Sequence, residues 1–269
     1  MSVSARYYTD PACPWSWSAE PAVRKLMVEF GDNISWTYVM GGLARDYTHT
    51  TKSPGGVERL LLHWLDVAEQ GGMPIDPRLW RDAAISSSYP SCMAVKAAAE
   101  QAPDAGYRYL RAVREGLMCF RRKLDTTEAL VEEARRAGLD VERFRIDLGS
   151  HAIVEAFGND LEETRGGAPE GRERIPFPSV VFDGGPAAYE FTSYDELRGA
   201  AEAAGAVRTG DPAPGVLEAL SRFGTMATAE VAAVCELPGP RAAAELWRLA
   251  SEWRVRPVRV VTGELWELA

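Results

Sequence analysis

The segment Thr9-Asp10-Pro11-Ala12-Cys13-Pro14-Trp15-Ser16 places one cysteine between a predicted strand and a predicted helix. Residues 4–8 are rich in strand-forming side chains, and the apolar pattern from residue 16 to residue 30 is helical. The first backbone N–H groups of a helix are unpaired, and the helix dipole is positive at that end. We therefore expect Cys13 to be held as a thiolate, with a pKa below the value of about 8.5 of a free thiol.

Ser16 stands three residues after Cys13, within one helical turn. Its hydroxyl can donate a hydrogen bond to the thiolate, and we expect the backbone N–H groups of residues 15 and 16 to help. A serine cannot do what a second cysteine does there, which is to attack a mixed disulfide and release the bound thiol. Cleavage of a mixed disulfide at Cys13 would therefore need a thiol from another molecule. The alternative is that Cys13 is a small buried residue in a turn.

The elements around this turn predict an α/β fold with an insertion. Residues 34–40 form a second strand, which completes a βαβ unit with a right-handed crossover. Residues 55–165 show helical patterns without strand signals and predict an all-α insertion. Strand patterns resume at 177–182 and 187–191, on either side of an Asp-Gly-Gly turn. Ser193, with a glutamate three residues on, predicts a capped helix that runs through residue 203.

The last part of the chain predicts a separate small module. Residues 208–215, Arg-Thr-Gly-Asp-Pro-Ala-Pro-Gly, have the composition of a linker, which divides the chain into a domain at 1–207 and a module at 216–269. Three helices followed by a terminal hairpin are the order of a winged helix. Residues 213–269 contain six arginines and seven glutamates, so the net charge of the module is about −1. A module that reads a DNA groove is instead basic. We therefore expect no nucleic-acid binding, and packing of the module against the main domain or in a homodimer.

Composition excludes several classes of protein. The chain has 269 residues and a net charge of −9, with neither an apolar stretch of about 20 residues nor a signal-peptide pattern. We therefore expect a cytoplasmic protein that does not bind membranes. The four cysteines lack the paired spacing of a disulfide scaffold or a zinc site, so no metal is expected. Cys92 and Cys119 are either buried structural residues or partners that could resolve a disulfide with Cys13.

Residues 10–17 resemble the active-site segment of the DsbA-like thioredoxin-fold proteins, which include FrnE-type dithiol oxidoreductases and adaptor-like members. They are also similar to the same segment of 2-hydroxychromene-2-carboxylate isomerases and kappa-class glutathione transferases. The order of elements in this family is βαβ, a helical insertion and ββα, which matches residues 3–205. The resemblance thus implies a thioredoxin fold, to which the winged-helix-like module is appended.

A second motif supports the resemblance. Phe177-Pro178, at the start of the strand after the insertion, matches the proline that family members carry in a cis peptide bond facing the active-site turn. The resemblance implies that Pro178 shapes the opposite wall and that the backbone at Phe177 offers an edge to a substrate chain. It makes Cys13, Ser16 and Pro178 the predicted catalytic residues. The predicted substrate contacts are Pro14, Trp15 and Phe177.

These observations favour a cytosolic thiol–disulfide oxidoreductase with one active-site cysteine. Such a protein would exchange mixed disulfides with a protein or small-molecule partner and would use glutathione or another small thiol as co-substrate, with no bound cofactor. Ser16 departs from the family pattern, which has a second cysteine there, and two alternatives remain open. One is a glutathione-transferase or isomerase-type enzyme acting on a small organic substrate. The other is a non-catalytic adaptor or protein-binding member of the fold, which the extra module also fits.

Overall fold

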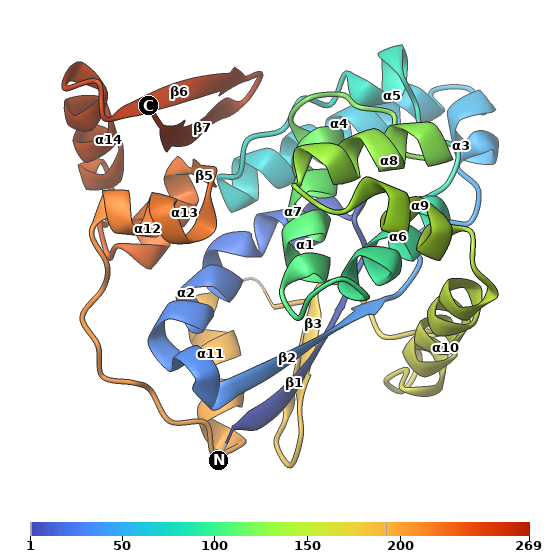
Figure 1. The fold of residues 1–269 in the computed structure, drawn as a ribbon, viewed down its shortest axis with the longest axis horizontal. Coiled ribbons are helices and arrows are strands. Elements are labelled where there is room, and N and C mark those ends of the chain that lie inside the picture. The colour runs from blue at the N-terminus through green and yellow to red at the C-terminus, as the bar shows by residue number, and fades with distance from the viewer. Residues whose placement is uncertain (1, 192) are drawn as a thin grey trace.

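The computed structural model describes residues 2–191 and 193–269, in which a four-stranded sheet of order β2-β1-β3-β4 lies at the centre of the thioredoxin part (Figure 1). Strand β1 (Val3–Thr9) runs parallel to β2 (Ile34–Met40). On its other side β1 pairs antiparallel with β3 (Ser179–Phe182), which pairs antiparallel with β4 (Ala187–Tyr189). The predicted α/β thioredoxin fold, with its insertion between β2 and β3, is confirmed.

The helix predicted for residues 16–30 is two helices, α1 (Pro14–Ser18) and α2 (Glu20–Phe30), which meet at Ala19. Pro21 occupies the first turn of α2, where its missing N–H costs no hydrogen bond. Within one continuous helix its ring would clash with the carbonyl group four residues earlier, so the chain restarts the helix instead. A short 3₁₀ turn, η1 (Gly31–Asn33), leads into β2.

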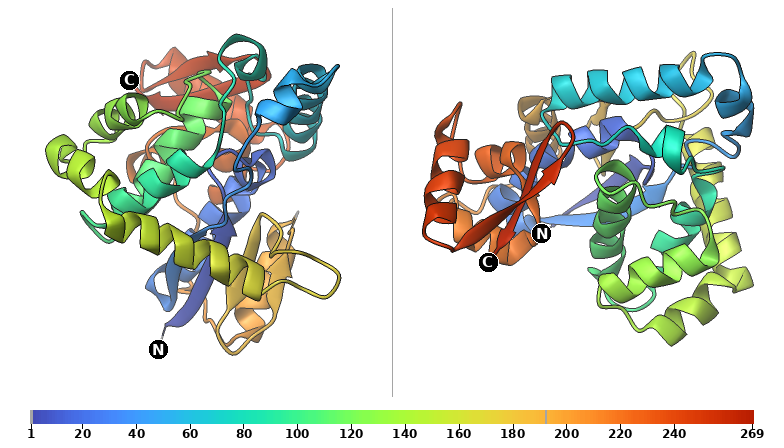
Figure 2. Two further views of the ribbon diagram at one scale, coloured as in Figure 1. Left: turned by 90° about the vertical axis from the view of Figure 1, so that its right-hand side faces the viewer. Right: turned by 90° about the horizontal axis from the view of Figure 1, so that it is seen from above.

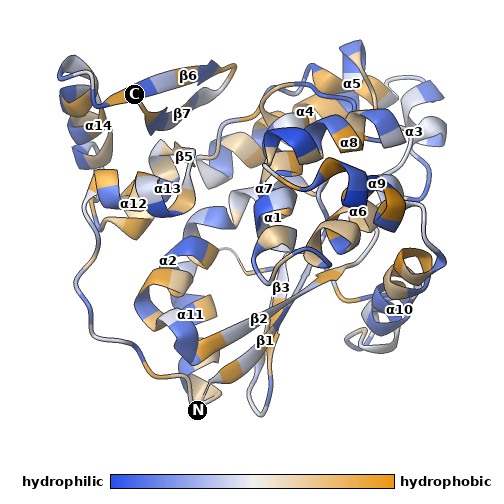
Figure 3. Ribbon diagram, in the orientation of Figure 1, coloured by the Kyte–Doolittle hydropathy of each residue, from blue (hydrophilic) through white to orange (hydrophobic). Residues whose placement is uncertain are grey.

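The insertion is entirely helical in the described chain between β2 and β3. Its helices carry both hydrophilic and hydrophobic residues (Figure 3), and the apolar ones surround Trp64 and Trp80, whose ring centroids lie 5.3 Å apart. The polar helix α3 was not predicted, because residues 48–52 have no apolar periodicity. The helices are α3 (Thr48–Lys52), α4 (Gly56–Gly71), α5 (Leu79–Asp82), α6 (Tyr89–Ala99), α7 (Ala105–Met118), α8 (Thr127–Arg136), α9 (Val141–Leu148) and α10 (His151–Gly166).

Helix α11 (Tyr194–Ala203) shares one apolar core with α2 and the sheet. Ser193 caps it and accepts a hydrogen bond from the backbone N–H of Glu196, whose side chain accepts one from the Ser193 N–H in return. The predicted capping box is therefore confirmed. The core between the two helices includes Leu26 and Leu197, both fully buried.

The C-terminal module follows the winged-helix order. It consists of helices and a three-stranded antiparallel sheet of order β5-β7-β6, and it lies beside the thioredoxin part along α2 (Figures 1 and 2). The predicted helices and terminal hairpin are present, whereas the two-residue strand β5 is too short to leave a pattern in the sequence. The elements are α12 (Val216–Phe223), β5 (Met226–Ala227), α13 (Thr228–Val234), α14 (Arg241–Ser251), β6 (Val255–Val260) and β7 (Gly263–Leu268).

The chain that connects α11 to α12 has no regular structure, yet it is held against the end of α2. The backbone N–H of Thr209 donates to the carbonyl oxygen of Glu29 at 2.8 Å. The side chain of Asn33 donates to the carbonyl oxygen of Val207, also at 2.8 Å. The predicted division of the chain at 208–215 stays a prediction. Across the described ranges, no helix is long and apolar enough to cross a bilayer.

Candidate functional site

Cys13 is the N-cap residue of α1 and faces the start of β3. Its Sγ accepts a hydrogen bond from the backbone N–H of Ser16 at 3.4 Å and lies 4.0 Å from the carbonyl oxygen of Phe177. The peptide bond between Phe177 and Pro178 is cis, as predicted. The turn itself is closed by a hydrogen bond of 3.2 Å from the Cys13 N–H to the carbonyl oxygen of Asp10. The two sequence motifs therefore meet at this sulfur.

The surroundings of Cys13 work against the predicted thiolate. Only 3% of the residue is exposed, and burial raises the pKa of its thiol above the ordinary value. The hydroxyl and N–H groups of Ser16 oppose this rise in pKa. The charge of Asp10 adds to it, and the charge of Arg114 opposes it. The helix start is present as predicted, but the loss of water outweighs it. The sequence shows where a helix begins and not how deeply the residue before it is covered.

The predicted site residues divide into four that line a cleft and two that do not. A cleft of about 610 Å³ is lined by Cys13, Pro14, Trp15 and Phe177, so one site contains the cysteine and all three predicted substrate contacts. Ser16 lies behind this surface and is fully buried, and within the described residues its Oγ makes no hydrogen bond of good geometry. Pro178 is also buried. The catalytic roles predicted for Ser16 and Pro178 stay predictions.

No sequence motif pointed to the arginines that line the rim of the cleft. Arg174 donates to the carbonyl oxygens of Gly42 and Leu43 at 3.0 and 3.2 Å and lies 5.0 Å from the centre of the Phe177 ring. Arg172 pairs with Glu190 at 2.7 Å. The available signal was the charged, glycine-rich loop at 165–174 just before the proline motif. Its position at the cleft depends on how α10 packs. The charged lining residues are Arg165, Arg172, Glu173, Arg174 and Glu190.

Behind the cysteine turn, the carboxylate of Asp10 is fully buried and joins the turn to α6. It accepts hydrogen bonds from the Ala12 N–H at 2.7 Å, the Ser88 hydroxyl at 2.8 Å and the Cys92 thiol at 3.3 Å. Burial raises the pKa of Asp10, and these donors oppose the rise. The carboxylate therefore fixes the positions of the turn and of α6 relative to each other.

The two cysteines of the insertion are buried, and each has a hydrogen-bond partner other than Cys13. Cys92 is engaged by Asp10, and the Cys119 thiol donates to the carbonyl oxygen of Pro74 at 3.2 Å. All four cysteines are free and buried. Burial raises the pKa of both insertion thiols well above the ordinary value, which favours the structural alternative. In the part of the chain that the structure describes, no group of three or more His, Cys, Asp or Glu side chains could hold a metal ion.

Comparisons with known proteins identify the family and point to a different function from the one predicted. A family model described as thioredoxin matches residues 7–166. The ClpXP adapter protein SpxH of Bacillus subtilis is 26% identical over 266 residues, which are 97% of this chain and 87% of that protein. The SpxH protein of Halalkalibacterium halodurans is 35% identical over 161 residues, and this match spans about half of that relative, 53%.

Solved structures agree on the fold. A protein of Nitrosomonas europaea, described as a candidate disulfide isomerase, has a TM-score of 0.63 at 18% identity and covers 75% of this chain and 97% of its own. The cytosolic disulfide reductase DsbM of Pseudomonas aeruginosa has a TM-score of 0.56 at 21% identity. The match covers 74% of this chain and 97% of DsbM. At these identities the likeness concerns the fold alone.

The predicted main function, a thiol–disulfide oxidoreductase, is wrong, because the relatives that align along nearly the whole chain are named adapter proteins. The adaptor alternative agrees better with these relatives. The matched residues 7–166 make up more than half of the chain and contain Cys13 together with the helical insertion. The chain therefore belongs to the thioredoxin family, in its DsbA-like form.

Proposed function

We propose that this protein is a non-catalytic adaptor that binds a protein partner and presents it to ClpXP. The observation that carries the proposal is the 26% identity to a ClpXP adapter protein along 97% of the chain. That length includes the C-terminal module as well as the thioredoxin part. The proposed role would place the protein in the cytoplasm and involves no cofactor. A homodimer through the module stays a prediction.

The chemistry of the Cys13 site supports binding without turnover. A catalyst of disulfide exchange needs a thiolate to attack and a second thiol to release its partner. Here burial raises the pKa of Cys13, and Ser16 occupies the position of the second thiol. Both requirements for turnover are therefore poorly met at this site.

The cleft supports a protein segment as the bound partner. Trp15 and Phe177 supply apolar walls, and the rim carries three arginines against two glutamates in a chain whose net charge is −9. Of these, Arg172 and Glu190 neutralise each other. We expect the partner segment to place apolar side chains against the walls and a carboxylate near Arg165 or Arg174.

A proteome comparison tests the adaptor role. We expect a set of proteins to accumulate both in cells that lack this protein and in cells that lack ClpXP. Re-expression of either the parent or Cys13→Ser should return them to normal levels, because an adaptor needs the cleft and not the thiol. The proposal fails if Cys13→Ser does not restore these levels while the purified parent reduces insulin disulfides. It also fails if the two sets of accumulating proteins do not overlap.

A further inference from the structure

Six charged side chains form an ion network at the junction of α2, α7 and α13, and five of them are buried. Three guanidinium groups face three carboxylates, so the network is balanced in charge. Such a network is costly to assemble and far more costly to break on one side, because an unpaired buried charge then remains. Its members are Glu20, Arg24, Arg111, Arg114, Glu115 and Glu230.

The C-terminal module supplies an essential part of this network. Glu230, on α13, receives two parallel hydrogen bonds from Arg111, at 2.7 and 2.9 Å, and lies 3.1 Å from Arg24. Both arginines also donate to the carbonyl oxygen of Thr225, at 3.2 Å each. Without the module, two buried arginines of the thioredoxin part would keep only the carboxylates of Glu20 and Glu115.

The other end of the network reaches the segment that carries Cys13. Arg114 donates to Glu20, the first residue of α2, and to the hydroxyl of Thr9, which lies four residues before Cys13. Arg111 stacks on Trp17 of α1, with the guanidinium carbon 4.4 Å from the ring centre. A chain of contacts therefore links Glu230 to both sides of the cysteine turn, through Arg111 on one side and through Glu20 and Arg114 on the other.

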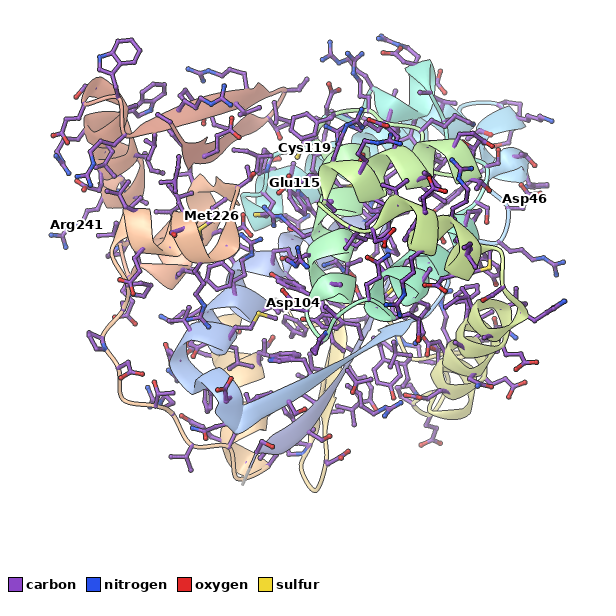
Figure 4. The ribbon with its side chains drawn as sticks, viewed as in Figure 1. Asp46, Asp104, Glu115, Cys119, Met226 and Arg241 are labelled. Atoms are coloured by element: carbon purple, nitrogen blue, oxygen red, sulfur yellow. The ribbon has the colours of Figure 1, made fainter. Side chains whose placement is uncertain are left out.

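The hairpin of the module makes a second, uncharged contact with the same region. The Thr262 hydroxyl, between β6 and β7, accepts from the Ile75 N–H at 2.7 Å and donates to the Ile75 carbonyl at 3.2 Å. The neighbouring Pro74 carbonyl accepts a hydrogen bond from the Trp17 indole. Figure 4 labels Met226 on the module side of the junction, and Glu115 and Cys119 on the α7 side. The hairpin is thus engaged within the chain.

We propose that the docked C-terminal module regulates the Cys13 cleft by holding the cysteine turn closed through Glu230 and Thr262. When the module loosens, Arg24 and Arg111 lose Glu230. The support that Arg111 gives to Trp17 of α1 then weakens, as does its contact with Glu20, the partner it shares with Arg114 at the end of β1. A partner that binds the module would thereby change the affinity of the cleft, and the coupling is reciprocal. This regulation rests on the proposed function, which makes the cleft the binding site.

The experiment measures how fast iodoacetamide alkylates Cys13 at pH 7 in the purified full-length protein, by mass spectrometry of the peptide. Glu230→Gln removes the charge and keeps the shape, and we expect a rise in rate of about tenfold from local opening. Thr262→Ala removes the hairpin contact without changing any charge, and we expect a rise of about twofold. Glu245→Gln, on α14 and paired with Arg248, is the matched control and should leave the rate unchanged.

Hydrogen exchange across residues 226–268 shows whether the module has loosened. Faster exchange there together with an unchanged Cys13 rate in both test variants overturns the proposal. If Glu230→Gln does not fold, Thr262→Ala decides alone by the same two measurements. Alkylation needs neither a partner nor ClpXP. A failure of the adaptor role in the proteome comparison is therefore distinguishable from a failure of this coupling.

Discussion

The indole nitrogen of Trp17 donates a hydrogen bond of 3.0 Å to the carbonyl oxygen of Pro74. This bond ties the helix that follows Cys13 to the segment between α4 and α5, which also contacts the terminal hairpin. Trp17 is fully buried, so neither partner can replace the bond with one to water. The position of α1 is therefore set from the insertion as well as from the sheet.

Replacing this indole should destabilise the protein. Trp17→Phe removes the donor and leaves a small cavity, and we expect the free energy of unfolding to fall by about 2–4 kcal/mol. Trp253→Phe is the matched control, because that side chain is 87% exposed, and its effect should stay within about 0.5 kcal/mol. Urea unfolding of both variants measures the difference. Equal effects of the two substitutions would contradict the anchoring role.

The pH dependence of Cys13 alkylation should follow a raised pKa. Below the pKa, the thiolate fraction grows tenfold for each pH unit, so the rate should keep rising from pH 6 to pH 9 without a plateau. At pH 7 we expect Cys13 to react more slowly than the thiol of free glutathione. The measurement is the second-order rate at several pH values. A plateau between pH 6 and pH 8 would show that the thiolate is already formed.

Gly41 sets the shape of one wall of the cleft. A Cβ added there would lie 1.9 Å from the tip of the Phe177 ring, so Gly41→Ala must displace a cleft wall. We expect loss of partner binding, together with a destabilisation of about 1–3 kcal/mol from overpacking. Gly158→Ala, within α10 and with open space around it, should stabilise the protein by up to about 1 kcal/mol. Urea unfolding of the pair, with the proteome readout, checks both effects.

Arg114 should matter more than any exposed arginine. Arg114→Met keeps the bulk of the side chain and removes the buried cation that holds Glu20 and Thr9, at an expected cost of about 3–5 kcal/mol in unfolding free energy. Arg248→Met removes an exposed cation from pairs on α14 and should cost less than about 1 kcal/mol. Chemical unfolding of the two variants compares them. Similar costs would mean that the buried network contributes little.

The acid stability of the protein should reflect the same network. Burial alone would raise the pKa of Glu20, but the arginines around it outweigh burial and lower this pKa. A lowered pKa contributes stability above the ordinary glutamate value of about 4.3, and this stability is lost as the pH falls through the folded value. We expect Glu20→Gln to be less stable than the parent at pH 7, with a smaller difference at pH 3. A difference that does not change with pH would argue against an ionised Glu20.

Local signals in the sequence were enough to predict most of the fold. The β-branched run at 34–40, the Ser193 capping box and the proline motif at 177–178 each act over a few residues, and each appears as expected. The break at Ala19 was missed because the apolar pattern continues across it, and the restart follows from the ring of Pro21. Short polar elements such as α3 leave no periodic pattern.

The site was only partly predictable, because burial and loop position are tertiary properties. The sequence predicted that Cys13, Trp15 and Phe177 lie at one site, because the proline motif at 177–178 was expected to face the cysteine turn. All three line the same cleft. How far Cys13 is buried depends on how the insertion packs over the sheet, and so does the position of Arg174 at the rim of the cleft. Ser16 was compatible with three functions, and nothing local distinguishes an adaptor from an enzyme that uses an outside thiol.

The anchored connection between α11 and α12 has a practical consequence. Thr209 and Val207 are tied to the end of α2, and Arg208 between them is exposed, with Glu202 within 3.2 Å. A protease that cleaves after this arginine would leave both halves joined by the contacts at α13 and the hairpin. The nicked protein should therefore elute as a single species in gel filtration and yet separate into two bands on a denaturing gel.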